Sequence, residues 1–152
     1  MELFAKLDYE VLEFPTTRGH NQRPPKNNNV TVMRNTRAKT PSYRCYFSRD
    51  ISDVIKKKQL THFLFHRERY SGGIYIVFFR GNDNISGRIW NNSNGYSRIT
   101  NKGLIKWFGE QLRMAGDFSA HIPISNDLEE SADSAVFKLE IDKAKIINFN
   151  NN

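Results

Sequence analysis

The sequence predicts an α+β, mostly-β fold in which two tandem β-β-α-β-β units form one pseudo-twofold, barrel-like domain. Three observations support this prediction. Short runs rich in β-branched and aromatic residues recur along the chain, two stretches have helical periodicity, and the same order of elements occurs twice. A chain of 152 residues is long enough for one domain of this kind.

The sequence divides into three parts. Residues 1–29 are expected to contain a strand or short helix and then a basic arm rich in Pro, Asn and Gly. Residues 30–142 form the predicted domain, with one unit at 30–81 and the other at 85–142. Residues 143–152 form a tail.

The first unit begins with two runs of strand character. Residues 30–34 and 43–47 are joined by a polar connection, and Ser48 is suited to cap the helix that follows. Three apolar side chains then recur at helical spacing: Ile51, Val54 and Ile55. Two further strand-like runs, 61–69 and 74–80, flank Tyr-Ser-Gly-Gly, which predicts a hairpin.

The second unit repeats this order. Residues 85–90 and 96–100 have strand character, a helix is expected to begin near Asn101, and strands follow at 118–125 and 135–141. The helix has apolar side chains on one face: Leu104, Trp107, Phe108 and Leu112.

Two arginines occupy matching positions in each unit. Arg34 and Arg44 correspond to Arg88 and Arg98 at an offset of 54 residues, and the apolar helix positions match at an offset of 53. We interpret the repeat as an internal duplication. The alternative is a generic α+β domain whose halves are alike by chance.

Basic charge is concentrated in the first two thirds of the sequence. The net charge is +7 and the pI is about 9.6. Residues 15–60 carry eleven Lys/Arg and two Asp/Glu, whereas residues 115–152 carry three Lys/Arg and seven Asp/Glu. This asymmetry predicts one positive face and an anionic partner.

Catalytic and metal-binding patterns are not evident in the sequence. His62 and His66 are four residues apart on a predicted strand, a separation of about 13 Å that one metal ion cannot bridge. No Gly-rich phosphate loop precedes a helix. We therefore expect no enzymatic activity, no metal and no cofactor. The single cysteine, Cys45, and the lack of a long apolar run or secretory signal predict a cytoplasmic protein without membrane contact.

The pattern VMRN…SYRCYFSRDISDVIKKK…THFLFHRERYSGGIYIVFF resembles the AbrB/MazE-like transition-state regulators, which are DNA-binding swapped-hairpin barrels. The resemblance covers about residues 30–142 and rests on element order and a few arginines. It implies an interlocked barrel that two chains normally build together. Two tandem units therefore imply a monomeric pseudo-dimer, or a homodimer of the whole chain.

The resemblance also implies a binding site for duplex DNA. The family contacts DNA through basic residues on its first two strands and their loop, which correspond by position to Arg34, Arg37, Lys39, Arg44, Arg88 and Arg98. A two-stranded ribbon of this kind can enter the major groove. Basic residues of the arm, Arg18, Arg23 and Lys26, are expected to follow phosphates or the minor groove. The predicted function is that of a transcriptional-regulator-like protein.

Two alternatives remain open at this stage. The basic face could instead dock an acidic protein partner, as in an antitoxin-like or inhibitory interaction module. Binding of single-stranded nucleic acid would require exposed aromatic rings on the basic strands, where the candidates are Tyr43, Tyr46, Phe47, Tyr75, Phe78 and Phe79.

Overall fold

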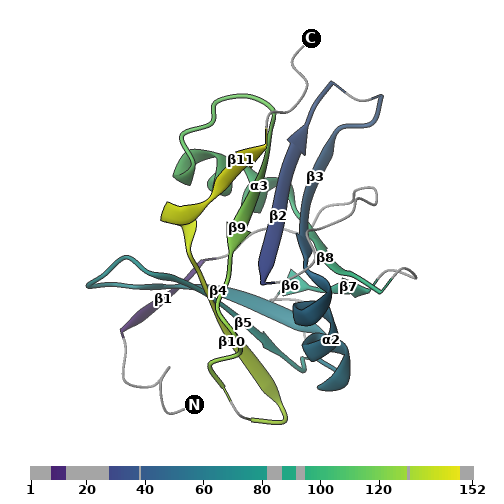
Figure 1. Cartoon of the computed structure of the whole chain (residues 1–152), viewed down its shortest axis with the longest axis vertical. Coiled ribbons are helices and arrows are strands. Elements are labelled where there is room, and N and C mark those ends of the chain that lie inside the picture. The colour runs from purple at the N-terminus through teal and green to yellow at the C-terminus, as the bar shows by residue number, and fades with distance from the viewer. Residues whose placement is uncertain are drawn as a thin grey trace.

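The fold is of the mostly-β α+β class, as the sequence predicts, and the described residues form two antiparallel sheets and two α-helices (Figure 1). The computed structural model describes residues 8–12, 28–37, 39–81, 87–91, 95–129 and 131–147. No helix in these ranges is long and apolar enough to cross a bilayer.

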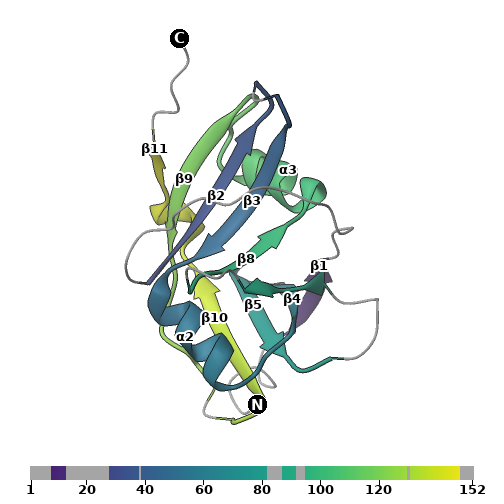
Figure 2. The ribbon, with the colours of Figure 1, turned by 90° about the vertical axis from the view of Figure 1, so that its right-hand side faces the viewer.

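The six-stranded sheet has the strand order β11-β9-β2-β3-β8-β7. Its members are β2 (Asn29–Asn35), β3 (Ser42–Phe47), β7 (Trp90–Asn91), β8 (Ser97–Thr100), β9 (Phe118–Pro123) and β11 (Lys145–Ile147). Strand β11 comes from the predicted tail and pairs with β9. Figures 1 and 2 show β2, β3 and β9 running side by side as the long centre of this sheet.

The five-stranded sheet has the path β1-β4-β5-β10, with β6 also paired to β4. Its members are β1 (Tyr9–Leu12), β4 (His62–Glu68), β5 (Ile74–Phe79), β6 (Gly87–Arg88) and β10 (Ser134–Leu139). Strands β1 and β6 share one edge of β4, where β1 pairs with residues 65–68 and β6 with residues 62–63. The N-terminal segment around Tyr9 is therefore a strand.

One main core lies between the sheets and helices α2 (Arg49–Lys57) and α3 (Lys102–Gln111), and a short 3₁₀ helix, η1 (Ile141–Lys143), precedes β11. The helical apolar positions predicted from spacing enter this core: Ile51, Ile55, Leu104 and Phe108. Phe65 of β4 meets Phe108 edge to face, with ring centroids 5.8 Å apart. Cys45 is fully buried in the same core.

The two helix starts differ. The Asn101 side chain accepts a hydrogen bond from the amide of Leu104 at 2.8 Å and caps α3 as predicted. Ser48 is the N-cap residue of α2 as predicted, but it makes no side-chain cap hydrogen bond, because its hydroxyl donates to Asp50 and accepts from the amide of Asn29.

The order of elements predicted for each unit occurs twice, as β2-β3-α2-β4-β5 and then β6-β8-α3-β9-β10, where the offset that relates Arg34 to Arg88 makes β6 the counterpart of β2. The single strand predicted at residues 85–90 is wrong, because its described part is divided between β6 and the additional short strand β7, which belong to different sheets. Four ladders join strands of the first half to strands of the second: β2 with β9, β3 with β8, β4 with β6 and β5 with β10. In the part of the chain that the structure describes, the strands form two sheets and do not close into a barrel. The barrel implied by the family resemblance is thus not observed.

Candidate nucleic-acid interface

Four basic side chains near the five-stranded sheet pair with acids of the β1 segment and of the segment between β9 and β10. Four ion pairs among the described residues have N–O distances of 2.6 to 3.4 Å: Arg67 with Glu10, Arg69 with Asp8, Arg80 with Asp133 and Lys58 with Asp127. These contacts join β1 and the segment between β9 and β10 to the rest of the fold. The acidic C-terminal part therefore supplies structural partners for this group of basic residues.

The run of three lysines at the end of α2 also has structural contacts. Lys56 donates to the carbonyl of Gly95, and the Lys58 ammonium donates to the carbonyls of Ser134 and Glu129 as well as to Asp127. Lys57 alone in this run is exposed. The helix dipole favours all three positions, and no ligand is required to explain them.

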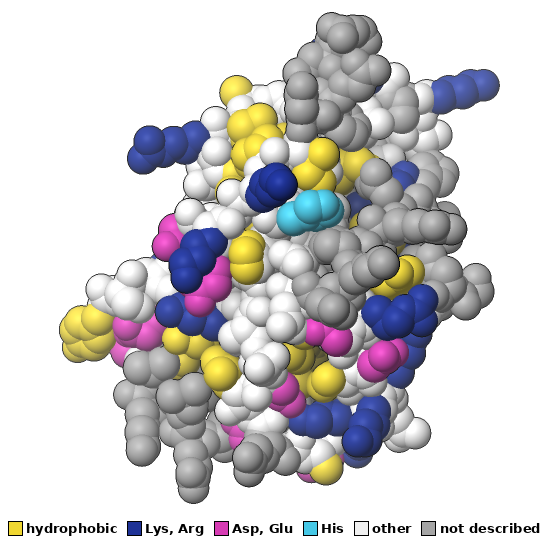
Figure 3. Space-filling model, viewed as in Figure 1, with side chains coloured by type: hydrophobic (Ala, Val, Ile, Leu, Met, Phe, Trp, Pro, Cys, Tyr) yellow, Lys and Arg dark blue, Asp and Glu magenta, His cyan; other side chains and the backbone are white. Residues whose placement is uncertain are grey.

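Charged residues are distributed unequally over the described structure. The six-stranded sheet, α3 and their connections (residues 28–48, 90–91, 95–124 and 144–147) contain nine Lys/Arg and two Asp/Glu, whereas the other described residues contain ten of each. The nine are Arg34, Arg37, Lys39, Arg44, Arg98, Lys102, Lys106, Arg113 and Lys145. In Figure 3, the upper part of the described surface shows Lys and Arg side chains, and the Asp and Glu side chains lie in its middle and lower parts. The positive excess thus belongs to one end of the molecule.

The tip of the β2–β3 hairpin presents two of these cations. Arg37 and Lys39 are both exposed. The tip is tied to the segment before β9, because Asp117 accepts hydrogen bonds from the amide of Thr36 at 3.0 Å and from its hydroxyl at 2.7 Å. One of the two acids in this region therefore fixes the tip that carries the cations.

Helix α3 lies beside this tip, and the helix and the residues that follow it present three more cations. Lys102 and Lys106 are exposed on the side of α3 opposite the buried Leu104 and Phe108, and Arg113 is exposed two residues beyond the end of the helix at Gln111. The helix packs against β2 and β3, as Figure 2 shows, and the Lys102 ammonium lies 5.5 Å from the centre of the Tyr43 ring. We call the exposed side chains of Arg37, Lys39, Lys102, Lys106 and Arg113 the basic end.

Arg44 and Arg98 lie together on the face of the six-stranded sheet that points away from the core. They belong to neighbouring strands, where Arg44 is opposite Thr100 and Arg98 is opposite Tyr46. Arg44 is only 6% exposed, and its guanidinium donates to the Ser42 hydroxyl at 2.6 Å. Burial lowers the pKa of Arg44, an effect to which Arg98 adds and which Tyr46 opposes. Because Arg44 is buried, we do not include it in the basic end.

The other predicted contact residues are dispersed. Arg34 is half-buried at the end of β2, on the same side of the strand as Val32. Arg88 is in β6, opposite His62, and its side chain lies outside the described part. The predicted arm residues Arg18, Arg23 and Lys26 also lie outside the described residues.

The aromatic residues considered for base stacking are mostly inside the fold. Four of them are buried: Tyr46, Phe47, Tyr75 and Phe78. Tyr43 and Phe79 are partly buried. These rings do not form an exposed stacking platform, so the observed packing does not favour the single-strand alternative.

Lys102, Lys106 and Arg113 were not among the residues predicted to bind nucleic acid. The spacing of Lys102 and Lys106, four residues apart and out of phase with the apolar helix positions, is the signal that could have identified them. Among the described residues, no group of three or more His, Cys, Asp or Glu side chains could hold a metal ion. The chain matches no family model, no curated protein and no solved structure.

Proposed function

We propose that this protein is a non-enzymatic, transcriptional-regulator-like protein that binds double-stranded DNA through the basic end. The observation that carries the proposal is the separation of charge, with nine Lys/Arg against two Asp/Glu around the six-stranded sheet and α3 and an even balance elsewhere among the described residues. The cations of the basic end are exposed, and three of those beside the five-stranded sheet, Arg67, Arg69 and Arg80, pair with carboxylates. Exposed cations on a hairpin tip and a neighbouring helix suit the phosphates of a duplex.

The expected energetics follow from counterion release. If each of the five cations of the basic end contacts one phosphate, the logarithm of the binding constant should fall with the logarithm of salt concentration with a slope of about −4.5. Phosphate contacts of this kind position a protein on DNA and do not by themselves select a sequence.

We also infer that the two halves are an interlocked duplication related by a pseudo-twofold axis. The pairing of β3 with β8 supports this. The repeat offset of 54 residues relates Arg44 to Arg98 and Tyr46 to Thr100. The twofold operation therefore exchanges the two observed pairs, Arg44 with Thr100 and Tyr46 with Arg98. The pair between Cys45 and Ile99 lies midway between them. A single chain would then provide the arrangement that a homodimer of the resembled family provides.

Two cation–π contacts support the same inference. Arg49, the first residue of α2, lies 4.9 Å from the Tyr96 ring, and Lys102, the first residue of α3, lies 5.5 Å from the Tyr43 ring. Each helix start thus contacts a tyrosine of the other half. The stretch of sequence between β6 and β8, residues 89–96, contains no basic residue, so DNA contacts should be centred on the first-unit tip.

The proposal is tested with paired charge variants. Arg37→Ala/Lys39→Ala removes two cations from the basic end, and Lys57→Ala/Lys143→Ala removes two exposed cations elsewhere. Binding to a fluorescent duplex of about 20 base pairs is followed by anisotropy over a range of salt concentrations. The first variant should bind about 10- to 100-fold more weakly at low salt, with a salt slope smaller by about 1.8.

The control variant should bind within about twofold of wild type. Equal losses in both variants would show that the effect is one of net charge alone and would contradict the assigned surface. A wild-type protein that binds no nucleic acid at low salt would refute the proposal and favour an acidic protein as the partner of the basic end.

A further inference from the structure

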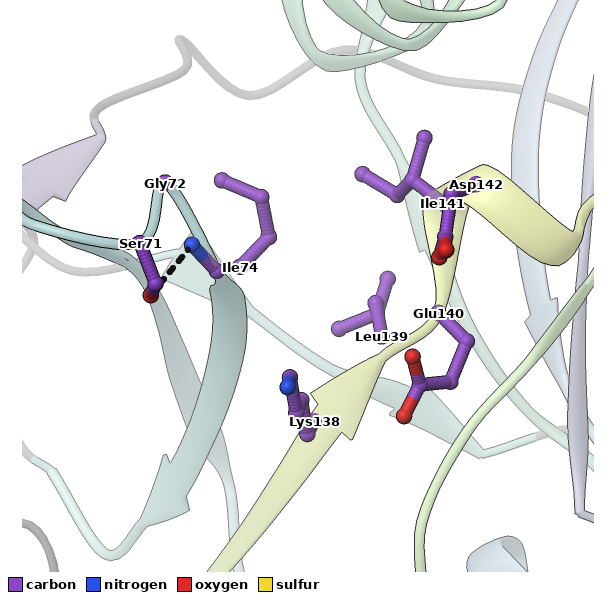
Figure 4. A pocket seen from close by; sticks show the side chains of 9 residues that line it. Ser71, Gly72, Ile74, Lys138, Leu139, Glu140, Ile141 and Asp142 are labelled. Carbon is purple, nitrogen blue, oxygen red and sulfur yellow. Dashed lines mark hydrogen bonds between the residues drawn. The ribbon is translucent and has the colours of Figure 1, made fainter.

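A separate hollow of about 380 Å³ opens between the β4–β5 hairpin turn and the end of β10 (Figure 4). It is lined by residues 71–74 on one side and residues 138–142 on the other. Its volume lies within the usual range for binding sites of small groups. Figure 1 shows the β4–β5 hairpin projecting to the left, away from the β2–β3 tip at the upper right.

The hollow combines an apolar floor with a charged rim. Ile74 and Leu139 are directly opposite each other in the β5–β10 ladder, and Ile141 extends the apolar surface. In Figure 4 the Glu140 and Asp142 carboxylates lie across the hollow from Ser71. With Lys138, the rim has two negative charges and one positive charge, so it favours a cation.

The hairpin wall of the hollow is held in one conformation by hydrogen bonds. The Glu68 carboxylate accepts from the amides of Tyr70 and Ser71, each at 2.9 Å, and these bonds hold the pKa of Glu68 below its usual range. The Ser71 hydroxyl accepts from the amide of Gly73 at 3.1 Å. Gly72 has a φ of +73°, a conformation that favours glycine. A wall fixed in this way reduces the ordering cost of binding.

An exposed aromatic ring lies on the same turn. Tyr70 is 91% exposed, although its backbone is fixed by Glu68. A tyrosine on a fixed backbone is a frequent anchor in protein interfaces, since it provides a large contact area with few rotatable side-chain bonds. The turn therefore places an aromatic anchor beside a preformed hollow.

We propose that this hollow binds the side chain of a lysine or arginine from a partner protein. The methylene stem of such a side chain would cover Ile74, Leu139 and Ile141, while its cationic head would reach the carboxylates of the rim. The Tyr70 ring would contact the partner beside the inserted side chain. The site is separate from the basic end, and the inference does not depend on DNA binding.

The test uses the full chain labelled with ¹⁵N and titrated with N-acetyl-lysine amide and N-acetyl-arginine amide. N-acetyl-norleucine amide has a comparable apolar stem without the charge and serves as the control ligand. The backbone amide signals of Gly72, Gly73 and Leu139 should shift saturably with both cationic probes at millimolar concentrations. The norleucine probe should bind at least tenfold more weakly.

Two variants locate the interaction. Glu140→Gln/Asp142→Asn should weaken binding of both cationic probes by at least tenfold, whereas Asp53→Asn/Glu110→Gln, which changes two exposed helix carboxylates, should leave binding unchanged. Retention of the dispersed wild-type spectrum checks that each variant is folded.

Three results would overturn the proposal. They are the absence of saturable shifts at Gly72, Gly73 and Leu139, equal binding of the norleucine probe, and undiminished binding by the Glu140→Gln/Asp142→Asn variant. Tighter binding of free 1,5-diaminopentane than of the blocked lysine would assign the hollow to a small amine and would likewise contradict docking of a protein side chain.

Discussion

Replacement of Lys58 by methionine should destabilise the fold by about 3 kcal/mol. The Lys58 ammonium lies 2.6 Å from the Asp127 carboxylate and 2.9 Å from the carbonyl oxygen of Ser134, and the two charged side chains are only 19% and 17% exposed. Removal of one member of a buried ion pair costs about 3–5 kcal/mol. The lower end applies because Asp127 is partly exposed and keeps its hydrogen bonds from the amides of Glu129 and Val136.

The neighbouring lysine provides the matched control. Lys57→Met removes the same charge at the same helix end, but Lys57 is exposed and should change stability by less than about 0.5 kcal/mol. Methionine preserves most of the apolar stem in both variants, so the difference reports the ammonium contacts. Urea unfolding followed by circular dichroism measures both free energies. Equal losses below about 0.5 kcal/mol in the two variants would refute the assignment of Lys58 to the fold.

Three further predictions follow from buried or crowded positions. Backbone amides lower the pKa of Glu68, so its carboxylate stabilises the fold above about pH 4.3. The difference in unfolding free energy between wild type and Glu68→Gln, measured in urea, should therefore disappear as the pH falls below that value. Burial raises the pKa of the Cys45 thiol, and a thiol reagent should therefore label it only after unfolding. A methyl group at Gly87 would lie 2.3 Å from the Phe63 ring, so Gly87→Ala should cost about 1–3 kcal/mol in thermal or urea unfolding, whereas Gly116→Ala, which adds its methyl in open space, should cost nothing measurable.

The sequence predicted most individual elements because local patterns determine them. The helical spacing of Ile51 with Ile55 and of Leu104 with Phe108 identifies both helices, and Asn101 marks the start of the second. Residues 74–79 are apolar almost throughout because β5 is a central strand, paired on both sides by β4 and β10. The order of strands within each sheet depends on pairs distant in the sequence, which no local pattern specifies.

The candidate site was less predictable because exposure and pairing are not local properties. Alternation places Arg44 on the face opposite Cys45, but it does not show that this face is buried. Arg67 and Arg80 resemble free basic residues in the sequence, yet their carboxylate partners are more than fifty residues away. The fold therefore decides which basic side chains are exposed and which pair with carboxylates. The distribution of basic residues along the sequence does not.

The central claim is that the basic end is a binding surface for duplex DNA, and the most direct test is a titration of wild-type protein. A labelled duplex and the corresponding single strand are each titrated at 0.05 M and 0.2 M salt. We predict tighter binding to the duplex and a loss of affinity between the two conditions of about 10- to 500-fold, where the upper value corresponds to five phosphate contacts. Absence of saturable duplex binding at 0.05 M salt, or equal affinity at both concentrations, would contradict the claim.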